Sequence, residues 1–133
     1  MNLLVTPLMI MMENKLEASA LRQKVIANNL ANIDTPGFKK SHVEFEDVLR
    51  QVQNKDRLSL HKTDTRHIDL SFTNIEAVKA RVEIDNSTSL RNDGNNVDVD
   101  KEMAELAKNG LDYQAFAQIL ADKYSGRKKL ITG

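Results

Sequence analysis

The chain has 133 residues and a balanced charge, with 19 Lys and Arg against 19 Asp and Glu. That length accommodates one domain. The balance argues against a nucleic-acid-binding protein, which needs basic residues to displace phosphate counterions, and against simple adhesion to an acidic membrane. The absence of Cys excludes disulfides, thiol nucleophiles and thiolate metal sites. Aromatic residues make up only 5% of the chain, so the composition favours long helices over a compact enzyme.

Apolar residues in the first thirty positions recur at steps of three and four, which predicts an amphipathic helix. Pro7 suits the first turn of such a helix better than its interior. The predicted contact face consists of Met9, Met12, Leu16, Ser19, Gln23, Ile26 and Leu30. We assign residues 1–39 to this helix and its C-terminal turn.

An asparagine-rich turn is predicted at the end of the helix. Its residues are Asn28, Asn29, Asn32, Thr35, Pro36, Gly37 and Phe38. Asn competes with helical hydrogen bonding and tolerates left-handed geometry, and Pro-Gly favours a type II turn. An ordinary helix stop explains Pro36 and Gly37 but leaves three Asn residues among Ala and Leu unexplained.

The first helix also contains a sequence that looks like a secretion signal. Residues 18–20 resemble a signal-peptidase site, but no Lys or Arg precedes the apolar run 8–12, and Glu13 interrupts the apolar pattern. The run is too short to span a bilayer. We therefore expect no cleaved signal peptide, and export by another route if the protein leaves the cytoplasm.

Residues 40–96 form a polar middle region, which we expect to be variable and partly mobile. Residues 43–49 predict a short amphipathic helix. Residues 68–72 and 80–84 alternate as half-buried strands do and can pair with each other. Asp93-Gly94 then predicts a turn before the last helix.

Residues 97–133 predict a long C-terminal helix with a heptad seam. The seam consists of Val99, Met103, Leu106, Gly110, Tyr113, Ala117, Leu120 and Tyr124. Further apolar positions widen this face, which indicates more than one neighbour. Asp98 or Asp100 can cap the start of the helix. Gly110 indicates either close approach of a neighbour or a tolerated substitution.

The sequence predicts no catalytic residue, metal site or cofactor. His42 with Glu44 and Glu46, or His61 with His67, could be imagined as metal ligands, but neither set has a dependable ligand spacing. A calcium loop beginning at residue 93 fails at its glycine and twelfth positions, and a glycine-rich phosphate loop is absent.

Two blocks of sequence resemble a known family. The segment Ala27-Asn28-Asn29-Leu30-Ala31-Asn32-Ile33-Asp34-Thr35-Pro36-Gly37-Phe38-Lys39 resembles the N-terminal signature of bacterial flagellar rod, hook and related axial proteins. A second block begins Asn95-Asn96-Val97-Asp98 and continues to Ala115, and it resembles the C-terminal signature of the proximal rod members. The second block departs from the family at Gly110, where a larger polar residue is more usual.

This resemblance implies a non-enzymatic subunit of the proximal rod of the flagellar basal body, in the periplasm. It implies export by the flagellar type III system and polymerisation through the terminal helices into a torque-transmitting shaft. The implied partners are further copies, other rod proteins, the rod-base adaptor subunit, the export gate and the membrane ring.

The residues alone predict a mainly α protein that self-associates. Its N- and C-terminal helices pair as a coiled coil, and its irregular middle contains short β elements. A soluble coiled-coil adaptor or an export chaperone is the alternative function.

Overall fold

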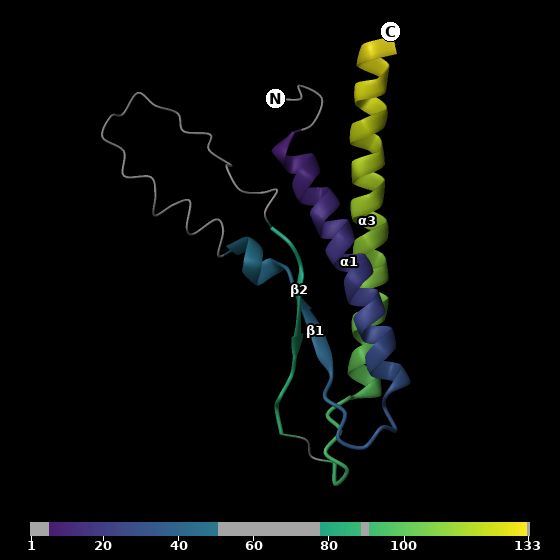
Figure 1. Cartoon of the computed structure of the whole chain (residues 1–133). Helices are drawn as coiled ribbons and strands as arrows, with labels where there is room; N and C mark the ends of the chain where they lie inside the picture. Colours follow the sequence, from purple (N-terminus) through teal and green to yellow (C-terminus); the bar gives the residue numbers. More distant parts are fainter. Residues whose placement is uncertain (1–5, 51–77, 89–90, 133) are drawn as a thin grey trace, which may run out of the picture.

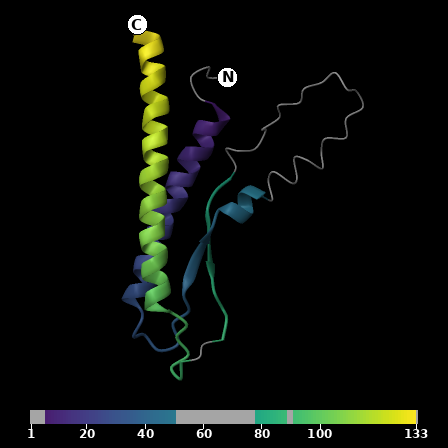
Figure 2. The ribbon, with the colours of Figure 1, turned by 180° about the vertical axis from the view of Figure 1, so that it is seen from behind.

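The computed structural model of the protein describes residues 6–50, 78–88 and 91–132. Two long helices run antiparallel and side by side, so that the start of α1 and the end of α3 point toward the same end of the molecule (Figure 1). Seen from behind, α3 extends past the start of α1 (Figure 2). The elements in chain order are α1 (Pro7–Ala31), β1 (Ser41–Glu44), β2 (Arg81–Ile84) and α3 (Val99–Thr132). The predicted mainly α fold with paired terminal helices and short β elements is confirmed.

The first helix begins where the sequence predicts. Pro7 occupies the first turn, where its missing N–H costs nothing. The Thr6 carbonyl accepts hydrogen bonds from the N–H groups of Met9 (2.9 Å) and Ile10 (3.2 Å). At the other end Asn32 is the C-cap, and its N–H donates to the Asn28 carbonyl at 3.2 Å.

Two glycine turns lie next to each other below the helices. The Phe38 N–H donates to the Thr35 carbonyl at 3.2 Å, and Gly37 has φ of 72°. This is the predicted type II turn, whose third residue requires positive φ. In the second turn, Gly94 has φ of 77° and donates to the Arg91 carbonyl at 3.1 Å.

The middle region forms a two-stranded antiparallel ribbon, in which β1 pairs with β2 and Val43 lies opposite Val82. The predicted strand over 80–84 corresponds to β2, whose partner here is β1. The predicted pairing with residues 68–72 stays a prediction, because those residues lie outside the described part of the chain. The predicted helix over 43–49 is displaced, because residues 43–44 belong to β1 and residues 46–50 are helical. Pairing with a distant strand overrides the local apolar pattern here.

The densest apolar packing lies where the ribbon meets α1. Ala18, Phe45 and Val78 are buried together, and Val48, Leu49 and Ala80 pack around them. Elsewhere α3 leaves large apolar side chains exposed, including Met103 and Leu111. The single chain therefore covers only part of its apolar surface.

The last helix is capped as predicted. The Lys101 N–H donates to the Asp98 carboxylate at 3.2 Å, and acidic Asp100 and Glu102 complement the helix dipole in the first turn. Among the described residues, no helix is both long enough and apolar enough to cross a membrane. At Gly110 a Cβ would meet no atom of the described residues within 4 Å, so a close neighbour at this position would have to come from outside this part of the chain.

Two glycine substitutions should change stability in opposite directions. Gly37→Ala should destabilise the subunit by about 1–2 kcal/mol, because its positive φ disfavours any Cβ. Gly110→Ala should instead stabilise it by up to about 1 kcal/mol, because the position is helical and open. Urea denaturation of the two variants measures both effects, and a shift of the same sign in both would contradict this assignment.

Candidate assembly site

The two predicted signature blocks bind each other. Asn95 is fully buried, and its side-chain amide lies against the end of α1. The amide donates to the carbonyls of Asn32 (2.9 Å), Ile33 (2.9 Å) and Thr35 (3.0 Å). These three carbonyls belong to the turns that follow α1, so a residue of the second block is hydrogen-bonded to the backbone of the first. We call this arrangement the asparagine clasp.

Neighbouring bonds extend the clasp to the ribbon. The Asn96 amide donates to the Asp85 carbonyl at 2.8 Å, and its side-chain oxygen accepts from the Lys40 N–H at 2.7 Å. The Gly37 N–H donates to the Asp93 carbonyl at 2.8 Å. Hydrogen bonds thus join the two glycine turns, the ribbon and the ends of both helices. Most of these bonds run from the side-chain amides of Asn95 and Asn96 to the backbone.

The residues of the predicted turn motif differ in their contacts and in their burial. Asn28 is exposed, and its carbonyl accepts from the Asn32 side chain at 2.9 Å. Thr35 donates its hydroxyl to Asn32 at 3.3 Å. Pro36 and Gly37 are exposed turn residues, and Phe38 is half-buried.

Asn29 is the buried member of the motif. Its amide donates to the Ser41 carbonyl (2.8 Å) and to the Glu102 carboxylate (3.0 Å), and its oxygen accepts from the Ser41 N–H (2.9 Å). This one side chain therefore connects α1, β1 and α3. Its role explains why an Asn stands at a helical position with poor intrinsic propensity.

A second polar contact lies within the helix pair. Ser19 and Asn109 are both buried. The Ser19 hydroxyl donates to the Asn109 side-chain oxygen at 2.8 Å, and the Asn109 amide donates to the Ser19 carbonyl at 3.0 Å. The contact face between α1 and α3 is consequently part polar.

The predicted seam residues divide between the helix contact and the surface. Ile26 and Leu120 are buried. Leu16, Leu30, Leu106 and Ala117 are half-buried. Val99, Met103, Tyr113 and Tyr124 are each 43–51% exposed. Sequence reasoning missed Glu102 and Asn109 as members of the contact, because polar residues do not enter an apolar pattern.

Glu46 ties the ribbon to α1. Its carboxylate pairs with Lys15 and, at 2.9 Å, with Arg22. Partial burial by itself would raise the pKa of Glu46, but hydrogen bonds from Lys15 and the backbone, together with the charge of Arg22, lower that pKa from 4.5 to about 2. The Lys15 ammonium also lies 5.5 Å from the centre of the Phe45 ring, as in a cation–π contact.

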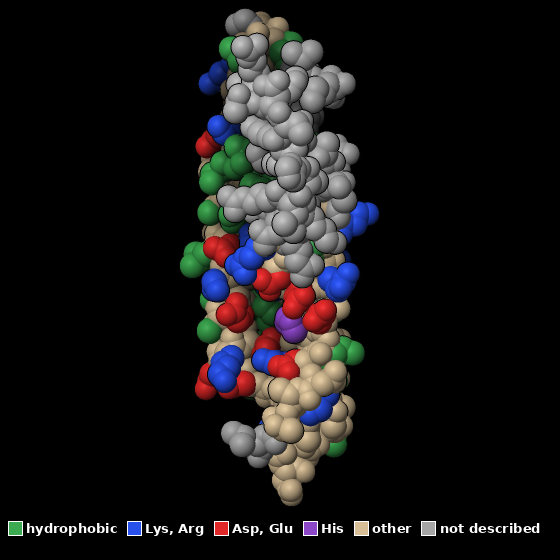
Figure 3. All heavy atoms as spheres, turned by 90° about the vertical axis from the view of Figure 1, so that its left-hand side faces the viewer, with side chains coloured by type: hydrophobic (Ala, Val, Ile, Leu, Met, Phe, Trp, Pro, Cys, Tyr) green, Lys and Arg blue, Asp and Glu red, His purple; other side chains and the backbone are tan. Residues whose placement is uncertain are grey.

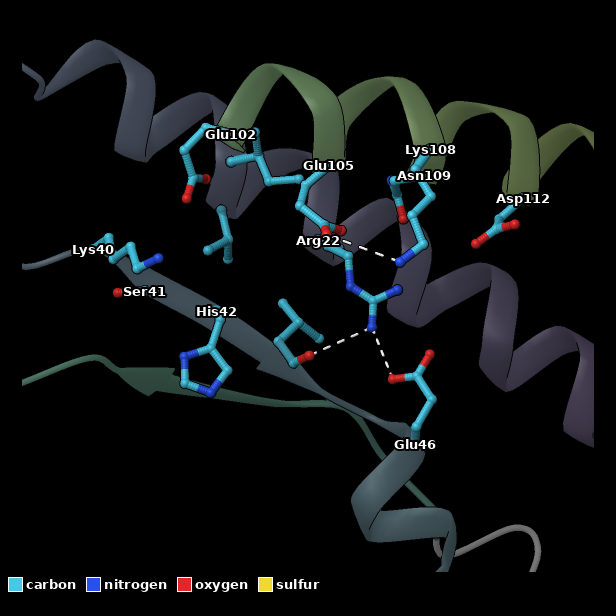
Figure 4. Close-up of a pocket in the computed structure, with 13 residues that line it drawn as sticks. Arg22, Lys40, Ser41, His42, Glu46, Glu102, Glu105, Lys108, Asn109 and Asp112 are labelled. Carbon is cyan, nitrogen blue, oxygen red and sulfur yellow. Dashed lines mark hydrogen bonds and ion pairs between the residues drawn. The ribbon is translucent and has the colours of Figure 1, made fainter. Parts of the chain in front are cut away.

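A charged groove of about 330 Å³ lies between α1, β1 and α3 (Figure 4). Its basic side chains include Arg22, Lys40 and Lys108, and its acidic ones include Glu105 and Asp112. Arg22 also donates to the Val43 carbonyl at 3.4 Å. Glu46 and Glu102 also line the groove, so side chains of both signs lie along its walls and partly offset one another.

On the outer face of the ribbon, charged side chains surround a histidine (Figure 3). Ligand atoms of His42, Glu44 and Glu83 lie within 4.8 Å of one another, and this is the group of the described residues that could hold a metal ion. From the sequence, His42 with Glu44 and Glu46 is considered and set aside for want of a dependable ligand spacing, and Glu46 is not in this group. Glu83 enters only through the strand register, which pairs it with His42. These side chains lie at the surface, away from the asparagine clasp.

Comparisons with known proteins identify the type of chain. A family model described as "Flagella basal body rod protein" matches residues 14–39. The chain is 43% identical over 122 residues to the flagellar basal body rod protein FlgB of Bacillus subtilis, covering 92% of this chain and 91% of that protein. It is 37% identical to FlgB of Borreliella burgdorferi (80% and 82% covered) and 32% identical to FlgB of Escherichia coli (90% and 88% covered).

The stability of the asparagine clasp should depend on the N–H donors of the Asn95 side chain, and a polar side chain without donors should not replace them. Asn95→Asp replaces an amide with a carboxylate that cannot donate and that faces three carbonyls. We expect a loss of about 1–3 kcal/mol in unfolding free energy, measured by urea denaturation. Asn92→Asp is the matched control, because Asn92 is exposed in the same turn. Equal stability of the two variants would contradict the role given to Asn95.

The Glu46 contacts should produce a defined pH dependence. A carboxyl whose pKa is lowered on folding stabilises the fold above its unfolded pKa, here 4.5, and this contribution fades as the pH falls toward about 2. The difference in melting temperature between the parent and Glu46→Gln should therefore be greatest at neutral pH and shrink over that window. Asp47→Asn serves as the control, because Asp47 is exposed and pairs only within its own helical turn, with Arg50. A Glu46→Gln difference that stays constant with pH would rule out this account.

Proposed function

The chain belongs to the FlgB family of flagellar basal body rod proteins, and on that premise we propose that it is a structural subunit of the proximal rod of the bacterial flagellum. The observation that carries this function is identity of 43% to a FlgB protein across 92% of the chain. The match spans both helices and the asparagine clasp. It therefore favours a rod subunit over a coiled-coil adaptor or an export chaperone.

The surface through which this subunit assembles is an apolar stripe along α3. We define the α3 stripe by its members Val99, Met103, Gly110, Tyr113, Ala117 and Tyr124. An α-helix has 3.6 residues per turn, so these positions share one side of α3, beside the positions that face α1. Tyr113 and Tyr124 stand at the boundary between the two sides, where the Tyr124 hydroxyl donates to Glu13 of α1. Val99, Met103, Tyr113 and Tyr124 are each 43–51% exposed, and this exposure supports the proposal, since contiguous apolar surface typically marks an interaction site.

The stripe fits helical neighbours better than a globular one. Gly110 and Ala117 leave room for a close helix, and Val99, Met103 and Tyr113 supply the surface that it buries. A contact between unlike surfaces that does not close on itself generates an open helical assembly. We propose that copies of this chain and other rod proteins pack in this way.

Family membership supports association with other basal body rod components, and the finer arrangement is part of the proposal. The subunit is exported by the flagellar type III system without a cleaved signal peptide and lies in the periplasmic part of the rod. Its neighbours are the rod-base adaptor subunit, the export gate and the membrane ring. It transmits torque and needs no catalytic group, cofactor or metal ion.

The test of this function is incorporation into the rod. Met103→Asp places a charge in the middle of the exposed stripe, where burial against a neighbour would leave it unpaired. We expect secretion to continue and motility to fall by more than tenfold. Cells carrying the variant in place of the parent gene are scored by swimming and by the content of purified basal bodies.

Leu111→Asp is the matched control for this experiment. Leu111 is 70% exposed, more than Met103 at 51%, but it lies on α3 away from the stripe. It introduces the same charge in the same helix and should leave motility near the parent level. Normal motility of Met103→Asp would overturn the stripe as the assembly surface. Normal motility after deletion of the whole gene would overturn the proposed function itself.

A further inference from the structure

The apolar residues of α3 do not by themselves fix how it lies against α1. Leu106, Tyr113 and Leu120 follow one another at intervals of seven residues. Sliding α3 by seven residues therefore replaces one large apolar side chain with another at the same place in the contact. Such a slide moves the helix by about 10 Å along its axis. Another feature must therefore favour the observed alignment over the alignments shifted by seven residues.

The polar side chains in the contact do not repeat in this way. Position 109 is Asn, whereas the equivalent positions seven residues earlier and later are Glu102 and Phe116. Asn109 meets Ser19 through bonds of 2.8 and 3.0 Å, and Glu102 accepts from Asn29 at 3.0 Å. These four side chains are at most 7% exposed. Water cannot replace a lost partner cheaply at such positions.

We propose that these two buried polar contacts, Ser19 with Asn109 and Asn29 with Glu102, set the register between α1 and α3. A slide of seven residues in one direction brings Phe116 to Ser19 and leaves the Ser19 hydroxyl without its partner. A slide in the other direction brings Asn109 to Met12, which can neither donate to it nor accept strongly from it. A polar side chain at one seam position is known to specify coiled-coil register at a cost in stability.

The register has a consequence for assembly, and that consequence rests on the proposed function. The offset between the helices determines how far α3 extends past the start of α1 (Figure 2). It therefore fixes where the α3 stripe lies relative to the rest of the subunit. Subunits with mixed registers would present the stripe at different heights, and a regular helical assembly could not accept them.

The experiment measures the register in the purified full-length subunit. The chain has no Cys, so Lys24→Cys and Lys128→Cys place one spin label on each helix, at exposed positions. Pulsed electron–electron double resonance then gives the distance between the labels. The otherwise unchanged chain should show a single narrow distance.

In the Ser19→Ala, Asn109→Leu background we expect a second distance population, displaced by the roughly 10 Å axial shift of one heptad. Thermal stability should be unchanged or higher, because the polar pair is replaced by apolar groups. Leu120→Met is the matched control, since it alters the seam without touching a polar contact, and it should keep one distance. A single unchanged distance in the Ala/Leu background would overturn the role given to Ser19 and Asn109, and would leave the offset to the Asn29–Glu102 contact and the asparagine clasp.

A second variant keeps the test decisive if the Ala/Leu background loses its helical circular dichroism. The exchange Ser19→Asn with Asn109→Ser retains one hydroxyl and one amide at the same contact. One narrow distance at the parent value would support the proposal, and a broad or displaced distribution would overturn it. Because no rod is assembled in these measurements, their outcome is independent of motility, which tests the proposed function.

Discussion

The buried side chain of Asn95 is the contact on which the rest of the structure depends. It donates to three carbonyls at the end of α1, from a position four residues before α3 begins. The segment that follows α1 is thereby bound to the segment that precedes α3, about sixty residues later in the chain. Asn96 attaches the ribbon to this contact. A small apolar core alone could not hold the two helix ends so specifically, because apolar contact has no direction.

The subunit uses polar contacts where most helical pairs use leucine. Ser19, Asn29, Glu102 and Asn109 occupy buried positions between the helices, while Met103 and Tyr113 stay exposed on α3. Buried hydrogen bonds contribute little net stability but penalise wrong arrangements. This division makes the placement of the two helices against each other specific.

The sequence predicted the elements that depend on local chemistry. Pro7 at the helix start, the Pro36-Gly37 turn and the Asp98 cap each require only a few adjacent residues. The error lay in the middle, where Val43 pairs with Val82 across a gap of almost forty residues. The bonds of Asn95 could not be deduced either, since an asparagine in a turn has many local partners. The resemblance identified both motifs as important without indicating that they bind each other.

The heptad pattern of α3 predicts one seam, and the structure shows why the apolar face is wider. Positions 102, 106, 109 and 120 turn toward α1, whereas Val99 and Met103 lie on the adjoining side and Tyr113 stands at the boundary, 43% exposed. Both sets repeat at steps of three and four, so periodicity alone cannot separate them. The polar residues show which set faces α1, since Glu102 and Asn109 have hydrogen-bond partners on that helix. The apolar set without such partners is the one whose burial requires another molecule, which is why an assembly interface can be inferred from a single subunit.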